Sequence, residues 1–227
     1  MKQGVGGRIG RIAGMLVLAA LTGCHAGQSA APEGFTSLFD GRTLKGWRPY
    51  VGSPPEVAQM DASQYADALR RGFEELKLHW SVEDGVIITD GKGTNLCTAK
   101  DYSDFELLID WKIKPGGDSG IYLRGSPQVQ IWDRPDIGSG GLYNNEKHPS
   151  RPLAIADRKS GEWNTFRILM VGQRVTVFLN DVLVVDDVVM ENYWQRDQSI
   201  YLTGAIELQA HGDTVMFRNI YVRRIER

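Results

Sequence analysis

Apolar and polar residues alternate through most of this chain after Trp80. In the longest run, apolar residues occupy every odd position from Phe105 to Ile113. A period of two places one side of an extended strand against a core and leaves the other side for polar groups. Shorter alternating runs lie at 80–88, 120–124, 128–133, 163–170, 174–186, 205–211 and 215–223.

Turn-forming residues separate these runs. Asp84-Gly85 and Asn180-Asp181 are typical hairpin bends, and Pro115 to Asp118 closes the longest strand. Short strands at close spacing predict an all-β fold, a jelly-roll sandwich of two antiparallel sheets. Residues 134–160 are polar and rich in glycine and proline, which favours a long loop at the mouth of a site.

One stretch has a helical pattern instead. Tyr65, Leu69, Phe73 and Leu76 recur at spacings of three and four residues, so they share one side of a helix. The sequence therefore predicts a single helical insertion near 56–76, packed on the β domain rather than forming a domain of its own.

The N-terminal residues have the pattern of an export signal. Lys2, Arg8 and Arg11 precede an apolar run from Ile12 to Leu21, which is too short to span a bilayer. The run ends in Leu-Thr-Gly-Cys24, which resembles a bacterial lipobox. A plain secretory signal that happens to end near a cysteine is the alternative.

The predicted organisation follows from this signal. Residues 1–23 are the signal peptide, residues 24–33 are a tether lipidated at Cys24, and residues 34–227 are the β-sandwich domain. We expect a bacterial envelope lipoprotein that touches the membrane only through its lipid. Because His25 stands where an aspartate would favour inner-membrane retention, the outer membrane, facing periplasm or exterior, is the expected location.

Charge and cysteine content narrow the function classes. The net charge is −2, and removal of Lys2, Arg8 and Arg11 makes the mature chain more acidic, at −5, so nucleic acid is not an expected partner. With Cys24 lipidated, only Cys97 remains, which excludes an internal disulfide and a thiolate metal site. Cys97 is most simply a small buried strand residue, and a nucleophilic role would need a nearby histidine or cation.

Strand alternation gathers hydrogen-bonding side chains on one face of the predicted sandwich. Glu207, Gln209 and His211 lie opposite Ile206 and Leu208. Other strands present similar groups, namely Asp110, Tyr122, Arg124, Gln128, Gln130 and Trp132. Such a mixture of amide, charged and aromatic side chains suits the hydroxyls and apolar ring face of a sugar. Ordinary outward residues, each satisfied locally, are the alternative.

An ordered set of motifs resembles the 3-keto-disaccharide hydrolase domain family, also described as 3-keto-glucoside 1,2-lyases and 3-keto-2-hydroxy-glucal hydratases. The resemblance covers residues 34–224. It is carried by Phe35–Trp47, Trp80–Gly85, Tyr102–Leu107, Asp110–Ile113, Asp118–Ile121 with Arg124, Gln128–Asp133, Gly141–Tyr143, Glu162–Asn164, Asn180, Ile206–Gly212 and Phe217–Ile220.

The resemblance implies a concanavalin A-like fold and chemistry on sugars already oxidised at C3. A ketone at C3 acidifies the hydrogen on C2, so a base can remove it and the oxygen on C1 can leave by β-elimination. Hydration of the resulting glucal completes a net hydrolysis. The site then needs a base, a positive group or metal for the enolate oxygen, and a proton donor.

This elimination scheme suggests a role for each polar residue, as a hypothesis. His211 or Glu207 is the expected base, Arg124 the partner of the enolate oxygen, and Asp133 and Asp110 proton donor, orienter or metal ligand. The expected substrate-binding residues are Gln128, Gln130, Gln209, Tyr122, Trp132 and Tyr143. One divalent metal ion on oxygen and imidazole ligands is the cofactor that such a site could use.

Two departures from the family pattern leave other functions open. Gln128 stands where the family often has glutamate, and Asp118 where asparagine is common. The chain also lacks the Glu-x-Asp-x-Glu motif of glucanases with this fold, so hydrolysis by two carboxylates on one strand is unsupported. A non-catalytic, lectin-like binding lipoprotein would instead show exposed aromatic platforms, and a protein-binding lipoprotein a broad apolar patch.

Overall fold

The computed structural model describes residue 1 and residues 30–226. The predicted signal peptide after Met1, Cys24 and most of the tether therefore lie outside the described residues. In the part that is described, no helix combines the length and hydropathy needed to cross a lipid bilayer.

Most of the chain after residue 35 is strand and turn, with two helices. In chain order the elements are β1 Thr36–Ser37, β2 Trp47–Pro49, α1 Pro54–Val57, α2 Ala62–His79, β3 Trp80–Glu83, β4 Val86–Thr89, β5 Leu96–Thr98, β6 Phe105–Ile113, β7 Asp118–Leu123, β8 Ser126–Trp132, β9 Asn164–Val171, β10 Arg174–Leu179, β11 Val182–Val189, β12 Ile206–Leu208 and β13 Val215–Arg224.

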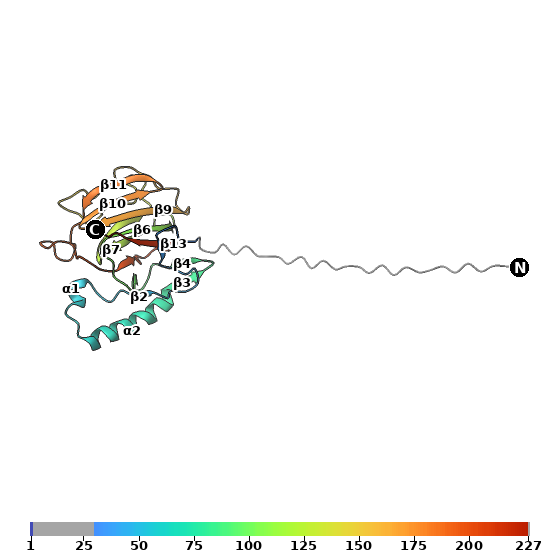
Figure 1. Cartoon of the computed structure of the whole chain (residues 1–227), viewed down its shortest axis with the longest axis horizontal. Coiled ribbons are helices and arrows are strands. Elements are labelled where there is room, and N and C mark those ends of the chain that lie inside the picture. Colours follow the sequence, from blue (N-terminus) through green and yellow to red (C-terminus); the bar gives the residue numbers. More distant parts are fainter. Residues whose placement is uncertain (2–29, 227) are drawn as a thin grey trace.

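The strands form two antiparallel sheets packed face to face (Figure 1). The eight-stranded sheet has the order β11-β10-β9-β6-β13-β4-β3, with β1 also paired to β13. The five-stranded sheet has the order β2-β5-β12-β7-β8. Non-consecutive strands are neighbours in both sheets, as in a jelly roll, and the predicted all-β sandwich is confirmed.

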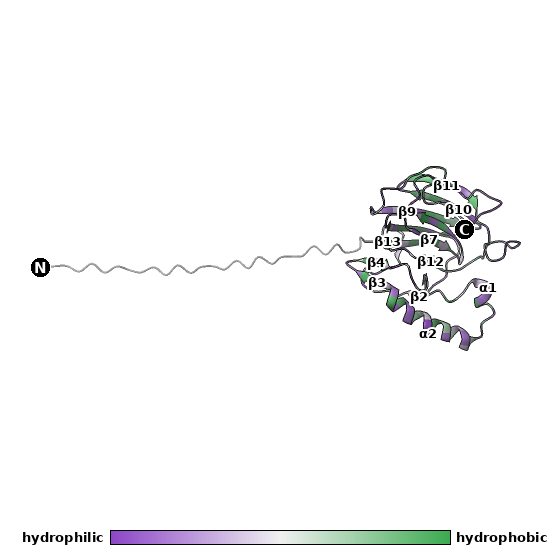
Figure 2. Cartoon of the chain, turned by 180° about the vertical axis from the view of Figure 1, so that it is seen from behind, coloured by the Kyte–Doolittle hydropathy of each residue, from purple (hydrophilic) through white to green (hydrophobic). Residues whose placement is uncertain are grey.

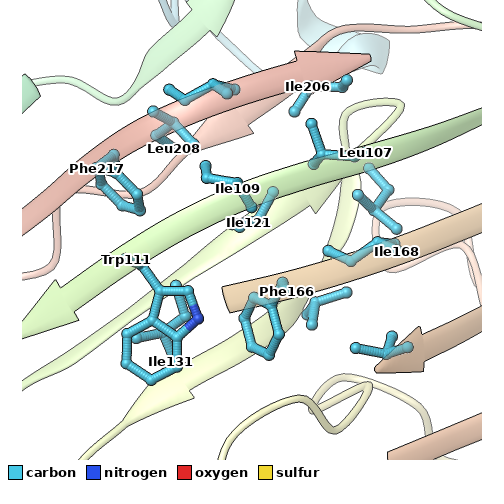
Figure 3. Close-up of a cluster of buried hydrophobic side chains, with 14 of the residues drawn as sticks. Leu107, Ile109, Trp111, Ile121, Ile131, Phe166, Ile168, Ile206, Leu208 and Phe217 are labelled. Carbon is cyan, nitrogen blue, oxygen red and sulfur yellow. The ribbon is translucent and has the colours of Figure 1, made fainter. Parts of the chain in front are cut away.

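Residues from the inner faces of both sheets make up the core. Figure 3 shows aromatic and aliphatic side chains of β6, β9 and β13 facing those of β7, β8 and β12. The labelled residues are all at most 1% exposed: Leu107, Ile109, Trp111, Ile121, Ile131, Phe166, Ile168, Ile206, Leu208 and Phe217. Full burial of one such side chain contributes roughly 1.5–3 kcal/mol. This burial fixes the register, since a slip by one residue would turn the polar face inward.

The predicted helical insertion is confirmed as α1 and α2. Asp61 caps α2 by accepting a hydrogen bond from the Gln64 backbone N–H at 2.8 Å, and the Gln64 side chain accepts one from the Asp61 N–H in return. The helix lies along β2, an edge of the five-stranded sheet (Figure 1). Gly72 allows this approach, because a Cβ there would lie 2.6 Å from Cβ of Pro49. Hydrophilic residues cover much of the helix surface (Figure 2).

Candidate active site

One residue from each strand of the five-stranded sheet forms a continuous row on its outer face. Register pairs Arg48 of β2 with Cys97 of β5, Cys97 with Glu207 of β12, Glu207 with Tyr122 of β7, and Tyr122 with Gln128 of β8. We call these five residues the central row. Residues next to them in the sequence belong to the core, so alternation turns the row away from it: Leu96, Ile121, Leu123, Val129, Ile206 and Leu208.

A second polar row runs beside the central row. Gln209 follows β12, donates its backbone N–H to the Gly120 carbonyl at 3.0 Å, and donates from its side chain to the Tyr122 hydroxyl at 3.3 Å. Gly120 is paired with Gln130. A Cβ on Gly120 would lie 2.8 Å from Cγ of Gln128, so the glycine lets the Gln128 side chain lie over the sheet.

Glu207 is a carboxyl group on this face with a strongly raised pKa. Its side chain accepts a hydrogen bond from the Asn95 amide at 2.5 Å, and Asn95 is itself fixed because its oxygen accepts the Ala210 N–H at 2.8 Å. Burial raises the pKa of Glu207 to about 7, although bonds from Asn95 and Cys97 and the charge of Arg48 act to lower it. A carboxyl group with a pKa near neutrality can take up and release a proton at physiological pH.

Glu207 lies in a cavity of about 290 Å³ between the sheet and the helical insertion. The same lining includes Arg48 of β2, Tyr50 directly after β2, and Cys97 of β5. The remaining walls come from α1, α2 and several loops: Gly52, Pro54, Val57, Ala58, Tyr65, Asp101, Arg124, Gly125, Tyr201, Thr203, Gly204 and Ala205. The helices therefore make the cavity by covering one end of the polar face.

Three further acidic groups around Glu207 hold their protons. Burial and the charge of Glu207 raise the pKa of Tyr50 and of Tyr122. The same two causes raise the pKa of the Cys97 thiol well above its usual range. Cys97 is thus a neutral thiol and a poor nucleophile, whereas the two phenols remain available as proton donors at neutral pH.

Gln128 and Gln130 form a relay toward Asp118. The Gln128 amide donates to the Gln130 oxygen at 2.8 Å, and the Gln130 amide donates to Asp118 at 2.6 Å. Both glutamines are buried, so these bonds fix their orientation. Gln128, the position where the family often has glutamate, is therefore held as a hydrogen-bonding group on the polar face.

The expected place of Arg124 is wrong. Its backbone borders the cavity, but it adopts a φ of 56° at a register shift after Tyr122, and its side chain is 1% exposed. The guanidinium donates to Asp104 at 2.8 Å and to the backbone oxygens of Ser103, Gly172 and Tyr201. These contacts hold the Arg124 guanidinium between loops, which it joins, and not beside Glu207.

His211 and Asp110 also lie apart from the central row. The extended strand ends at Leu208, and the chain turns at Gly212, so alternation does not carry as far as His211, which is exposed. Asp110 belongs to β6 of the other sheet, where it accepts hydrogen bonds from Thr165, Arg218 and Asn219. Of the residues expected to share one face, the structure brings together Glu207, Gln209, Tyr122, Gln128 and Gln130.

A larger cavity of about 390 Å³ lies at the end of β8, lined in part by Trp111, Trp132 and Asp133. Trp132 packs edge-to-face on the half-exposed Tyr143, with ring centroids 5.4 Å apart. Asp133 accepts the Gly116 backbone N–H at 2.8 Å, and this bond lowers the pKa of Asp133. The Asp133 carboxylate therefore stabilises the turn at Gly116.

A metal site does not emerge from the expected ligands. Among residues 30–226 there is no group of three or more histidine, cysteine, aspartate or glutamate side chains suited to hold a metal ion. Asp110 and Asp133 lie on different sheets, and each is bonded within its own sheet or turn. The described residues therefore do not fit such an ion.

Sequence reasoning missed three residues of the site, Arg48, Tyr50 and Asn95. Arg48 stands between the buried Trp47 and Pro49, so alternation on β2 could have placed it outward. Asn95 precedes β5 and reaches Glu207 across 112 residues of chain. No local pattern indicates that contact, because it depends on which strands become neighbours.

Comparison with known proteins finds a family and a relative that match most of this chain. The family model of the 3-keto-alpha-glucoside-1,2-lyase-like domain matches residues 34–223. A 3-keto-disaccharide hydrolase of Bacteroides thetaiotaomicron is 25% identical over 251 residues, spanning 86% of this chain and 79% of the relative.

Two crystal structures from Parabacteroides distasonis, both described as candidate glycosyl hydrolases, share the fold. One has a TM-score of 0.63 at 25% identity and covers 86% of this chain and 95% of its own. The other has a TM-score of 0.54 at 24% identity and covers 79% of this chain and 99% of its own. Because the family model spans nearly all of the described β-sandwich, the chain belongs to the 3-keto-alpha-glucoside-1,2-lyase-like domain family.

Proposed function

We propose that this protein cleaves 3-keto-glycosides by removing the C2 proton, eliminating the C1 substituent and hydrating the product. The observation that carries the proposal is Glu207, a buried carboxyl with a pKa of about 7, on a polar face beside a cavity. Family membership supplies the substrate class, and the named relative is a 3-keto-disaccharide hydrolase.

Glu207 acts as the base in the first step. Its carboxylate takes the C2 proton, and the C2–H electron pair forms an enolate with its negative charge on the C3 oxygen. Arg48, whose charge already acts on Glu207, is the cation that we assign to this oxygen. This assignment replaces Arg124, whose guanidinium is bonded elsewhere.

Collapse of the enolate breaks the bond between C1 and the glycosidic oxygen. The C3 carbonyl reforms, a double bond forms between C1 and C2, and the leaving oxygen takes a proton from Tyr122. Tyr122 can take this role because its raised pKa keeps the phenol protonated at neutral pH, and because Gln209 donates to its oxygen, which leaves the phenolic proton for a ligand.

Hydration reverses the proton movements. Water adds its oxygen to C1 and returns a proton to the Tyr122 phenolate, while protonated Glu207, after exchanging its proton with water that has entered the site, protonates C2. The sum is one glycoside and one water converted to a 3-keto-sugar and a free alcohol. Gln128 and Gln130 are assigned to the sugar hydroxyls, since their amides lie fixed on the same face.

The test replaces Glu207 with glutamine, which keeps shape and the bond from Asn95 but removes the base. We expect Glu207→Gln to lose at least about a hundredfold in turnover of a 3-keto-glucoside, the usual range for a general base. His211→Ala is the control and keeps most of the activity. Equal turnover by wild type and Glu207→Gln would reject Glu207 as the base.

Non-catalytic sugar binding is the second candidate, and Gln128 favours it. A glutamine at this position binds hydroxyls but supplies no acid or base. In that case the protein would bind a 3-keto-disaccharide in calorimetry without converting it, with or without a chelator, and Glu207→Gln would leave the affinity unchanged.

We further propose that the domain is anchored to the bacterial envelope through Cys24. The lipobox-like Leu21 to Cys24 sequence supports this location. Metabolic labelling with a fatty acid should mark the wild type and not Cys24→Ser, and the variant should leave the membrane fraction. A variant that is still labelled would contradict the anchor.

A further inference from the structure

Two neighbouring aromatic side chains are exposed in the segment between β11 and β12. Tyr193 is 41% exposed and Trp194 is 36% exposed, and their rings meet edge-to-face at 4.9 Å. Large aromatic rings that remain exposed side by side on a soluble domain commonly mark a binding surface. The proposed chemistry at Glu207 does not use these rings.

The segment that presents the two rings is fixed by internal hydrogen bonds. Asn192, which is 1% exposed, accepts the Trp194 and Gln195 backbone N–H groups at 3.1 and 3.0 Å and donates to the Ser199 carbonyl at 3.1 Å. The Tyr201 hydroxyl donates to the Gln195 side chain at 3.0 Å. The aromatic pair is therefore preorganised, which lowers the entropy lost when a ligand binds.

The pair also borders the Glu207 cavity. The Trp194 indole N–H donates to the Gly125 carbonyl at 2.6 Å, and Gly125 and Tyr201 both line that cavity. Tyr193 is close enough to Tyr122, in the central row, to affect its titration. The aromatic pair therefore lies next to residues that line the Glu207 cavity.

One side of the Tyr193 ring is already covered. The Arg196 guanidinium lies 5.1 Å from the ring centroid and is itself paired with Glu146 at 3.1 Å and Glu191 at 3.4 Å. With Arg196 and Trp194 packed against it, Tyr193 keeps the exposed part of its ring for a ligand. The nearby Gln195 and Tyr201 side chains supply polar groups at the edge of the platform.

We propose that Tyr193 and Trp194 form a stacking subsite for a second sugar ring, the ring that leaves from C1. The inference rests on the proposed function and deepens it. A pyranose places a face of C–H groups on an aromatic ring while its hydroxyls point sideways to polar groups. The subsite favours a substrate whose leaving group is itself a sugar over one with a small alkyl group.

The experiment compares two substrates and two variants. Wild type, Tyr193→Ala and the control Leu153→Ala, which removes an exposed apolar side chain elsewhere, are assayed on a 3-keto-disaccharide and on a methyl 3-keto-glucoside. We expect Tyr193→Ala to lose on the order of tenfold in kcat/KM on the disaccharide alone, mostly through KM, because one stacking contact is worth about 1 kcal/mol. Leu153→Ala should match wild type on both substrates.

Two results would overturn the subsite: equal losses by Tyr193→Ala on both substrates, or no loss on either. A binding titration separates this inference from the proposed function. If wild type cleaves neither substrate, the proposed function fails, and calorimetry with the unoxidised disaccharide still decides the subsite. Weaker binding by Tyr193→Ala alone supports it, and equal binding by all three proteins rejects it.

Discussion

At the scale of single residues, the site depends on where one carboxyl group is buried. Glu207 is separated from solvent by the helical insertion, and the amide of Asn95 partly offsets the resulting cost of ionisation. Sequence alternation predicted that Glu207 shares a face with Gln209 and Gln130. It could not predict the shifted pKa, since that depends on which loops cover the face.

The pH dependence of turnover should report this carboxyl. As a base, Glu207 must be ionised, so activity should rise as pH increases through about 7. Asn95→Ala removes a bond that lowers the pKa of Glu207, and we expect the rising limb to move to higher pH. Gln198→Ala, which changes an exposed amide, is the control. An unmoved limb in Asn95→Ala would contradict the positioning role of Asn95.

The same burial predicts how stability varies with pH. The pKa of Glu207 in the folded state, about 7, exceeds its usual value of 4.5, so the stability from the protonated group is complete below pH 4.5 and is lost as pH rises through 7. The loss is about 3 kcal/mol. In urea titrations, the free energy of unfolding of Glu207→Gln should therefore rise relative to that of wild type between pH 5 and 8. A difference between the two proteins that stays constant over this range would contradict the buried carboxyl.

At the scale of elements, alternation was a reliable guide only where the strand stays regular. It predicted the outward side of β12 and β8, but a register shift after Tyr122 sends Arg124 into the loops, and the end of β12 leaves His211 exposed. Both failures occur at strand ends, where backbone turns decide the direction of a side chain. Asp110 was misplaced for another reason: sequence alone did not assign β6 to the opposite sheet.

Arg124 should accordingly matter for stability. Arg124→Met breaks the ion pair that Arg124 makes with the mostly buried Asp104 carboxylate, and we expect a loss of about 3 kcal/mol or more in the free energy of unfolding. Arg70→Met breaks an exposed helical pair with Asp67 and should lose less than about 1 kcal/mol. If Arg124→Met is as stable as Arg70→Met but inactive, Arg124 acts in the chemistry after all.

At the scale of the whole molecule, the sequence predicted the sandwich, its turns and its helical insertion. Strong apolar alternation leaves little choice of fold once two sheets must cover each other. The site was less predictable because it joins β2, β5, β12, β7 and β8, which are spread over residues 47–208 of the chain. Arg48 and Asn95 reach Glu207 only through that strand order, and the helices that cover it come from a separate insertion.

The measurement that tests the account most directly follows the hydrogen on C2. A 3-keto-glucoside deuterated at C2 is cleaved in ordinary water, and the early 3-keto-sugar product is examined by NMR against a control for spontaneous exchange. Elimination and hydration with Glu207 as base predict that wild type and His211→Ala replace the deuterium with hydrogen, while Glu207→Gln forms almost no product. Product from wild type that retains the deuterium would contradict the account.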